Sequence, residues 1–125
     1  MRLLLDTQIV VWQQEGRLDR LGGGIAAIRE AEELLVSVVS FLEIGVKASV
    51  GKLRLPGDLR RHILDSGAQI LSLAPEHGLG VAALPLHHRD PFDRVLISQA
   101  KQERLTILTA DTQFERYDVP VLIAA

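Results

Sequence analysis

Residues 90–111 read DPFDRVLISQAKQERLTILTAD and contain the clearest helix start in the chain. Asp90 is a typical N-cap residue, and Pro91 stands at the first helical position, where its missing N–H costs nothing. Asp93 falls at the third position, where a negative charge interacts favourably with the helix dipole. This pattern predicts a helix from Pro91 to about residue 103, followed directly by a short apolar run.

The rest of the chain alternates in the same way between apolar runs and helical patterns. The runs predict strands over residues 3–5, 34–39, 70–73, 106–109 and 119–123. Helical patterns lie between them, over residues 9–14, 25–33, 40–50, 58–66, 75–83, 91–103 and 111–117. Strands that alternate with helices predict an α/β fold with a central parallel sheet of about five strands flanked by helices. We expect one domain over residues 1–125.

Four carboxylates stand where an apolar run ends and a helical pattern begins. They are Asp6, Glu43, Asp93 and Asp111. If the runs are parallel strands, these acids meet at the edge of the sheet where α/β folds bind their ligands. Like charges gathered there repel by roughly 1 to 4 kcal/mol per pair at about 4 Å. A cation held by oxygen ligands, Mg²⁺ or Mn²⁺, relieves that repulsion and suits phosphodiester chemistry.

Each carboxylate also has an ordinary structural explanation. Asp6 and Asp111 could cap helices, which is worth roughly 1 kcal/mol each. Glu43 could complete a capping box opened by Ser40, and Asp93 could serve only the helix dipole. The position of Asp6 favours a role beyond capping, because it directly follows three leucines, where an unpaired charge is costly. A cap and a metal ligand are compatible roles, so the residues alone leave both explanations open.

Composition narrows the class of protein. The 125 residues are 47% hydrophobic with few aromatic side chains, as expected of a parallel sheet covered by helices. The absence of cysteine excludes disulfides and thiolate metal sites. No uncharged run approaches the roughly 18 residues of a membrane helix, so we expect a soluble, cytoplasmic protein. The net charge of −2 does not by itself indicate a nucleic-acid-binding protein, although basic residues cluster over residues 47–61.

Other motifs are weaker. His87 and His88 are adjacent, without an HExxH or Cys/His framework, which favours structural or substrate-side roles over metal ligation. The glycines at 22–24 lack a phosphate-loop context. A phosphatase with Asp6 as nucleophile would need a second aspartate where Gln8 stands.

Several segments together resemble the PIN-domain nucleases, in particular the VapC-like toxins of type II toxin–antitoxin modules. They occur in the same order as in that family, over nearly the whole chain. The matching segments are residues 3–7, 36–47, 51–53, 55–56, 84–100 and 105–111, with Phe114 and Tyr117. The most specific is His88-Arg-Asp-Pro-Phe-Asp-Arg94.

The resemblance implies a Mg²⁺- or Mn²⁺-dependent endoribonuclease and gives roles to individual residues. The catalytic, metal-binding set falls on Asp6, Glu43, Asp93 and Asp111. Supporting roles fall on Thr7, Ser40 and Thr109, small hydroxyl residues that would orient the carboxylates, and on Asp90, which would act in capping or behind the ligands. Gln8 departs from the histidine that close relatives often carry. Lys47 and Arg94 lie near the acids in sequence, where they could contact phosphate or form internal ion pairs.

The resemblance also implies partners: an RNA substrate, a small antitoxin protein, a second copy of the chain and hetero-oligomers of toxin with antitoxin. Exposed candidates for these contacts are the helices predicted over residues 25–33 and 40–50. An alternative is a catalytically silent module that keeps the fold for binding protein or RNA. The four acids argue against that alternative, since a silent relative would be free to lose them.

Overall fold

The structure is a computed structural model that describes residues 1–55 and 57–124, and its centre is a five-stranded parallel sheet. The strands are β1 (Arg2–Leu5), β2 (Glu33–Ser37), β3 (Gln69–Leu71), β4 (Thr106–Thr109) and β5 (Val121–Ile123), in the order β3-β2-β1-β4-β5. β1 is central and pairs with β2 and β4. The predicted α/β fold with a parallel sheet is confirmed. Because β1 and β4 are neighbours, Asp6, which follows β1, lies beside Thr109 at the end of β4, 103 positions away.

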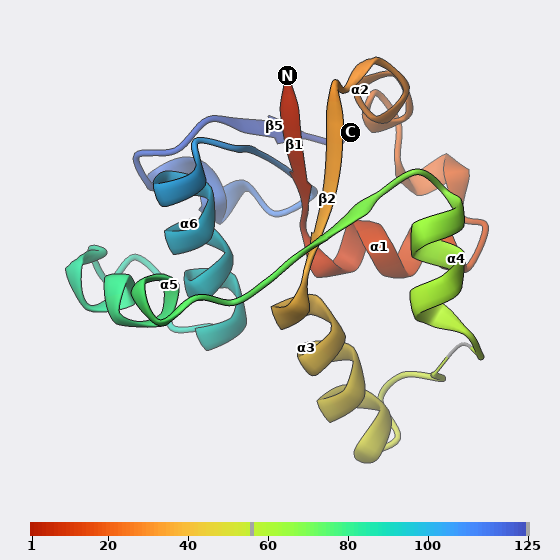
Figure 1. The fold of residues 1–125 in the computed structure, drawn as a ribbon, viewed down its shortest axis with the longest axis horizontal. Coiled ribbons are helices and arrows are strands. Elements are labelled where there is room, and N and C mark those ends of the chain that lie inside the picture. Colours follow the sequence, from red (N-terminus) through yellow and green to blue (C-terminus); the bar gives the residue numbers. More distant parts are fainter. Residues whose placement is uncertain (56, 125) are drawn as a thin grey trace.

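Helices cover both faces of the sheet. The α-helices are α1 (Thr7–Gln14), α2 (Gly24–Glu30), α3 (Val38–Ser49), α4 (Leu59–Asp65), α5 (Pro75–Leu79) and α6 (Pro91–Glu103). Short 3₁₀ helices are η1 (Leu18–Arg20), η2 (Gly80–Ala83) and η3 (Thr112–Arg116). Figure 1 shows α5 and α6 on one side of β1 and β2, and α1, α2 and α4 on the other, while α3 projects beyond the end of β2. Over the described ranges, no helix is long and apolar enough to span a bilayer.

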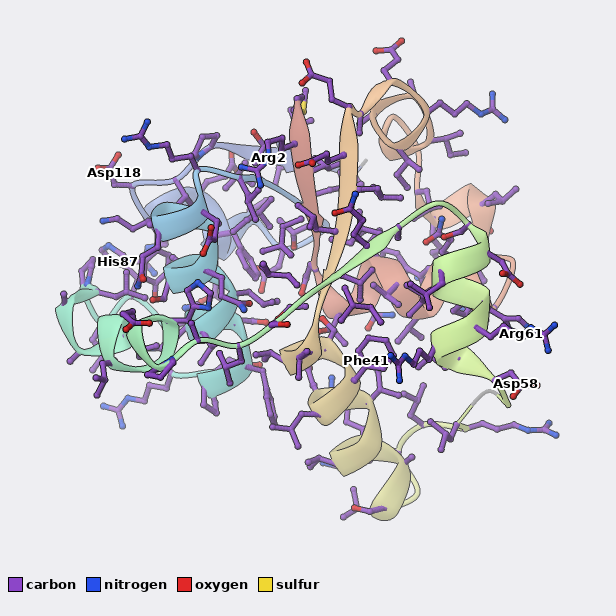
Figure 2. The ribbon with its side chains drawn as sticks, viewed as in Figure 1. Arg2, Phe41, Asp58, Arg61, His87 and Asp118 are labelled. Carbon is purple, nitrogen blue, oxygen red and sulfur yellow. The ribbon has the colours of Figure 1, made fainter. Side chains whose placement is uncertain are left out.

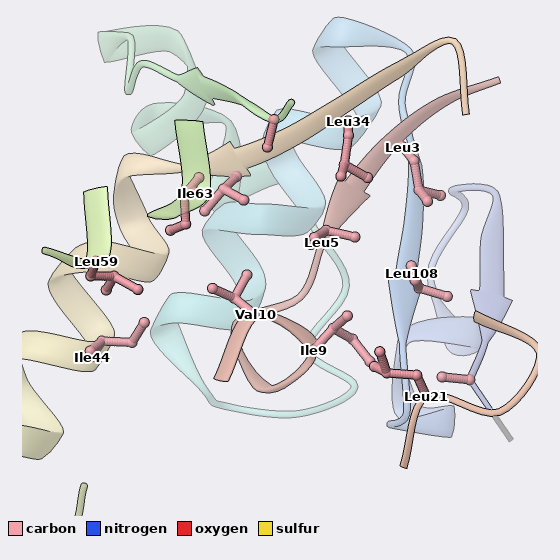
Figure 3. Packing of buried hydrophobic residues seen from close by; sticks show 13 residues of the cluster. Leu3, Leu5, Ile9, Val10, Leu21, Leu34, Ile44, Leu59, Ile63 and Leu108 are labelled. Atoms are coloured by element: carbon pink, nitrogen blue, oxygen red, sulfur yellow. The ribbon is translucent and has the colours of Figure 1, made fainter. Parts of the chain in front are cut away.

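Alternation along the strands divides the core between the two faces. Leu3 and Leu5 of β1 pack into the cluster beneath α1, α2 and α4, which Figure 3 shows from close by. Leu4 points the opposite way, into the cluster beneath α6. All three side chains are fully buried, and burying one leucine is worth about 1.5–3 kcal/mol. Burial on both faces explains why β1 reads as an unbroken apolar run rather than an alternating one.

The junction between β2 and α3 differs from the prediction. The strand ends at Ser37, and the β-branched residues Val38 and Val39, expected in the strand, form the first turn of the helix. The cause is Ser37, whose side chain accepts a hydrogen bond from the Val39 N–H and caps α3. The predicted capping box of Ser40 and Glu43 is therefore wrong, because both residues lie inside the helix. Local capping here overrides the preference of valine for strands.

Smaller differences concern the ends of other elements. α1 begins at Thr7 instead of residue 9, α2 ends at Glu30 instead of 33, and β3 ends at Leu71 instead of 73. The predicted strand 119–123 is reduced to β5, and the predicted helix 111–117 is the 3₁₀ helix η3.

The start of α4 was predicted at the right residue for the wrong reason. Asp58 occupies the N-cap position, but it has φ 55° and its side chain caps nothing. The preceding Pro56, part of one segment of the family resemblance, lies outside the described residues. By contrast, α6 begins at Pro91 with Asp90 as its cap and ends at Glu103, as predicted.

Candidate metal centre at the carboxyl ends of the strands

A cavity of about 290 Å³ opens where β1 and β4 end and where α3 and α6 begin. Its lining residues are Asp6, Gln8, Glu43, Lys47, Asp90, Asp93, Ala110 and Asp111. The fold thus brings together all four of the acids singled out from the sequence. Each comes from a different element: the end of β1, the second turn of α3, the first turn of α6 and the loop after β4. The ligand edge of the parallel sheet is therefore acidic, as expected.

Asp6 is buried in the wall of this cavity, with 6% of its surface exposed. The Thr109 hydroxyl donates a 2.7 Å hydrogen bond to its Oδ2. Asp6 precedes α1, yet its side chain makes no capping hydrogen bond, so the cap explanation is wrong for this residue. Burial raises the pKa of the Asp6 carboxyl to about 6, opposed by the Thr109 hydrogen bond and increased further by the charge of Glu43.

Glu43 is 4% exposed, and its two oxygens differ in their surroundings. Oε2 forms a 2.7 Å ion pair with the Lys47 ammonium one helical turn later. Oε1 is buried and has no hydrogen-bond partner among residues 1–55 and 57–124. Leaving a buried acceptor unpaired costs roughly 1–3 kcal/mol, more for a charged group. Because Glu43 also lines the cavity, a cation bound there would relieve this unpaired acceptor.

Two roles were considered for Lys47, and its contact with Glu43 confirms one of them, the internal ion pair. The hydrogen bond to Glu43 raises the pKa of the Lys47 ammonium, and the charges of Asp90 and Asp93 add to the effect. Lys47 is nevertheless about half exposed and also lines the cavity. The ammonium could therefore contact an anion at the mouth of the cavity.

The pKa of Asp93 is raised more than that of Asp6. The pKa of its carboxyl is raised to about 8, first by burial and then by the charges of Asp6, Asp90 and Glu43. Its neighbour Asp90 accepts hydrogen bonds from the backbone N–H groups of Phe92 and Asp93 at 2.9 and 3.1 Å. Asp90 thus caps α6, as predicted. Asp93 is left with its charge facing the other acids, and a nearby cation would relieve that repulsion.

Asp111 and Asp6 are connected through Thr109. The Asp111 N–H donates to the Thr109 hydroxyl at 3.0 Å, and the same hydroxyl donates to Asp6. Asp111 Oδ1 accepts from the Gln113 N–H at 2.9 Å and so caps η3. The cap explanation therefore holds for Asp111, and the residue lines the cavity as well.

The other two hydroxyl candidates contact each other. Thr7 Oγ1 and Ser40 Oγ are 2.8 Å apart and buried, joining α1 to α3. In the part of the chain that the structure describes, neither hydroxyl is hydrogen-bonded to a carboxylate. Their effect on the acids is therefore indirect, through the packing of the two helices that follow Asp6 and carry Glu43.

Arg94 lies outside the cavity wall. It is 8% exposed and donates to the carbonyls of Pro85, Val81 and Leu84 and to the Tyr117 hydroxyl. All of these acceptors are neutral oxygens. The guanidinium fastens the segment before α6 to that helix, so the structure supports neither the phosphate contact nor the ion pair considered for it.

His88 is a residue whose place the sequence did not reveal. Its Nδ1 lies 2.7 Å from the Tyr117 hydroxyl, and its Nε2 lies 3.4 Å from Asp93 Oδ2. A hydroxyl that donates to Nδ1 leaves the proton on Nε2, which then points at the carboxylate. Tyr117 is 29 residues away in the chain, so only the fold shows this arrangement. The sequence offers two signals for His88, the His87–His88 pair and the first position of the segment 88–94, but neither predicts this contact.

The donor set of the cavity fits a hard divalent cation, because the ligands are oxygens and Glu43 Oε1 is unpartnered. Within residues 1–55 and 57–124, however, no group of three or more Asp, Glu or His side chains is arranged so that it could hold a metal ion. The acids share one cavity without forming a finished ligand cage. Mg²⁺ does not require such a cage, since it keeps several waters and is usually bound by one or two carboxylates.

Comparison with known proteins gives a family and a fold. The family model of the PIN domain matches residues 3–120. No significant match is found among curated protein sequences.

Several solved structures have the same fold. VapBC2 from Rickettsia felis, bound to a DNA fragment from its promoter, is 16% identical over 100% of both chains, with a TM-score of 0.75. A toxin–antitoxin complex from Klebsiella pneumoniae is 16% identical over 98% of both chains (TM-score 0.70). DNA-bound VapBC from Salmonella typhimurium is 13% identical over 100% of this chain and 99% of that one (TM-score 0.67). At such identities the likeness concerns the fold, and what the chain does has to be argued from its own cavity.

Proposed function

The chain belongs to the PIN-domain family, and from that membership we propose that it is a Mg²⁺-dependent ribonuclease. Mn²⁺ is an alternative cofactor with the same preference for oxygen ligands. The observation that carries the proposal is the cavity that gathers Asp6, Glu43, Asp93 and Asp111 at the carboxyl ends of the strands, with one buried carboxylate oxygen unpartnered. A neutral ligand would leave these charges unbalanced, whereas a divalent cation would balance them.

The four acids have different roles in this proposal. Asp6 and Asp93 would hold the principal ion, since burial and mutual repulsion favour a cation beside them most strongly. Glu43, through Oε1, and Asp111, through the oxygen that does not cap η3, would hold waters or a second ion. A bound divalent cation would lower the pKa of a coordinated water from 15.7 towards about 7 and offset the charge of the phosphate.

Two further side chains support this chemistry. Thr109 keeps the Asp6 carboxylate in one orientation by donating to Oδ2. Lys47 reaches the cavity from α3 and would contact the substrate phosphate once a cation shares the charge of Glu43. The same lysine balances Glu43 in the absence of a cation.

We further propose that the protein is the toxin of a type II toxin–antitoxin pair, inhibited by a small protein and assembled as a homodimer. Solved structures with this fold include VapBC complexes. The chain offers two apolar surfaces to such partners. One is a groove of about 200 Å³ lined by Gln13, Leu18, Leu21, Ile25, Ile28 and Arg29. The other is an exposed row on α3 formed by Val38, Leu42, Val46 and Val50.

Co-expression with the product of the adjacent gene tests the toxin proposal. A stable complex that abolishes cleavage supports it, and cleavage unaffected by the neighbour argues against it. Light scattering of the free protein measures the homodimer. If the row on α3 forms that contact, Leu42→Lys should yield monomers and Leu18→Lys should not.

A catalytically silent binding module remains the second candidate, favoured by one observation. In the described part of the chain, the carboxylates do not form a ready group of three ligands. If the silent module is correct, RNA would bind without being cut and Mg²⁺ would change nothing.

Incubation of the purified protein with structured RNA, in Mg²⁺ and in EDTA, separates the two candidates. We expect cleavage in Mg²⁺, none in EDTA, and none with Asp93→Asn in either buffer. Asp118→Asn is the matched control, because Asp118 is an exposed acid at the outer surface of the molecule (Figure 2). Equal cleavage by Asp93→Asn and wild type would overturn the proposal.

A further inference from the structure

A buried hydrogen bond connects α3 to α6 away from the acidic cavity. The Ser37 hydroxyl donates to Gln99 Oε1 at 2.6 Å, although the two residues are 62 positions apart. Both are fully buried. The Ser37 hydroxyl also accepts from the Val39 N–H, the bond that starts α3. The residue that fixes the beginning of α3 is therefore itself held by α6.

The other end of the Gln99 amide is bonded as well. Nε2 donates to the Ser72 carbonyl at 3.3 Å, and Ser72 directly follows β3. Nε2 also lies 3.5 Å from His77 Nδ1, which already accepts from the Ala74 N–H. One side chain of α6 thus contacts the ends of two neighbouring strands. Since each contact uses a different atom of the amide, the position of Gln99 is strongly fixed.

The placement of this bond relative to the acids is regular. Ser37, the last residue of β2 and the N-cap of α3, precedes Glu43 by six residues, and Asp93 precedes Gln99 by six residues on α6. Six residues of helix span about 9 Å. Helical turns are stiff over that length, so a shift at the Ser37–Gln99 bond moves the two carboxylates relative to each other.

Apolar residues surround the bond between Ser37 and Gln99. Val39, Leu96 and Ala100, close in sequence to the two bonded residues, all belong to the apolar cluster beneath α6. A leucine at position 99 would add apolar surface there, whereas glutamine must have its amide satisfied inside the core. Without the glutamine amide the buried Ser37 hydroxyl would lose its acceptor, so Gln99 both satisfies that group and fixes its position.

We propose that Gln99 is a positioning residue, whose bond to Ser37 fixes the distance between Glu43 on α3 and Asp93 on α6. This inference rests on the proposed function, because the carboxylates need that distance only if they share a metal–water cluster. Gln99 touches neither the cavity nor the substrate, so it acts through the two helices.

Mn²⁺ affinity, measured by electron paramagnetic resonance on the intact chain, provides the test. We expect Gln99→Leu to weaken Mn²⁺ binding by roughly three- to tenfold, the range of coupling that such networks carry. Ser37→Ala removes the same bond, together with the cap on the Val39 N–H, and should weaken Mn²⁺ binding likewise. If Gln99→Leu does not fold, the Mn²⁺ affinity of Ser37→Ala tests the inference instead. Unfolding in urea without metal is recorded for every variant.

Matched controls exist on the same helix. Gln102→Leu removes an amide that donates to the Glu76 carbonyl, and Ser98→Ala removes a buried hydroxyl that donates to the His77 carbonyl. Both link α6 to α5 instead of α3, so Mn²⁺ affinity should stay at the wild-type value even where stability falls. If Ser37→Ala binds Mn²⁺ as tightly as Ser98→Ala does, the inference is overturned. A wild-type protein that binds no Mn²⁺ would overturn the proposed function itself.

Discussion

Leu5 and Asp6 are neighbours in the chain, yet they belong to two regions with opposite energetics. Leu5 ends the body of the sheet, where apolar side chains are fully buried against helices on both faces. Asp6 begins the carboxyl edge, where a carboxyl is also buried but shares its cavity with four other acids. Burial stabilises the first residue and penalises the charge of the second. The fold therefore obtains its stability from the body and bears a cost at the edge.

That cost has three visible forms. The pKa of Asp6 is raised to about 6 and that of Asp93 to about 8, and Glu43 Oε1 lacks a partner among the described residues. Proteins keep such groups where function requires them, at the expense of stability. The comparison predicts that substitutions at the edge abolish activity without harming the fold. Substitutions in the body should do the reverse.

The largest effect is expected from Asp6→Asn. Amide replacement removes one charge from the crowded edge and a ligand from the proposed cation, so RNA cleavage should fall by roughly a thousandfold or more. The metal-free protein should be at least as stable as wild type, because a repelling charge is gone. Single-turnover cleavage and urea unfolding in EDTA measure the two quantities. If Asp6→Asn is inactive because it is unfolded, the predicted contrast between the edge and the body of the sheet is contradicted.

Leu3→Ala is the counterpart in the body. It removes a fully buried side chain from the central strand, and such substitutions cost about 2–5 kcal/mol. The free energy of unfolding should fall by that amount, while the remaining folded molecules keep the wild-type affinity for Mn²⁺. Denaturant titration and a metal titration below the new melting temperature check this. A loss of Mn²⁺ affinity at full folding would show that body and edge are coupled.

The body was also the part that the sequence predicted well. Unbroken apolar runs located β1 and β4, and the Asp90-Pro91 signal located the start of α6 to the residue. These features depend on local propensity and on burial on two faces, which single segments express. The convergence of the four acids followed from the rule that parallel strands end at one edge.

What the sequence did not predict are contacts between distant segments. His88 reaches Asp93 only because Tyr117 fixes its ring, and Ser37 caps α3 while Gln99 holds it from another helix. The strand propensity of valine predicts Val38 and Val39 in β2, but the cap that Ser37 forms places them in α3. Arg94 resembled a phosphate ligand until its carbonyl partners were seen. A partner 29 residues away decides the role of His88, whereas the cap on the Val39 N–H is local and the carbonyl acceptors of Arg94 lie 9 to 13 residues away.

Addition of Mg²⁺ sharpens the comparison, because it should act on the edge alone. At about 100 times its dissociation constant, a ligand of the folded state stabilises by roughly 2.7 kcal/mol. The melting temperature of wild type should therefore rise by several degrees. Asp93→Asn should lose most of this rise, whereas Leu3→Ala should show the same increment from a lower starting point. A wild-type melting temperature unaffected by Mg²⁺ would remove the support for a cation site.

The smallest effect expected is the dependence of stability on pH without metal. The pKa values of Asp6 and Asp93 are raised in the folded protein from 3.8 to about 6 and about 8. Between pH 4 and 8 the folded state therefore holds more protons than the unfolded chain. The stabilising contribution is complete below pH 4 and is lost as pH rises through the two folded values. This is opposite to an acid whose pKa is lowered by an ion pair.

Urea titrations in EDTA at pH 5 and pH 8 measure this slope. We expect a loss on the order of 1 kcal/mol, because one unit of pKa shift corresponds to about 1.4 kcal/mol and solvent in the cavity weakens the effect. Asp93→Asn should flatten the slope, and Asp118→Asn should leave it unchanged. Saturating Mg²⁺ should reverse it, since the cation binds the charged carboxylates and therefore stabilises more at higher pH. A metal-free protein that is more stable at pH 8 than at pH 5 would mean that the edge acids are already balanced, and the contrast between Leu5 and Asp6 would lose its energetic basis.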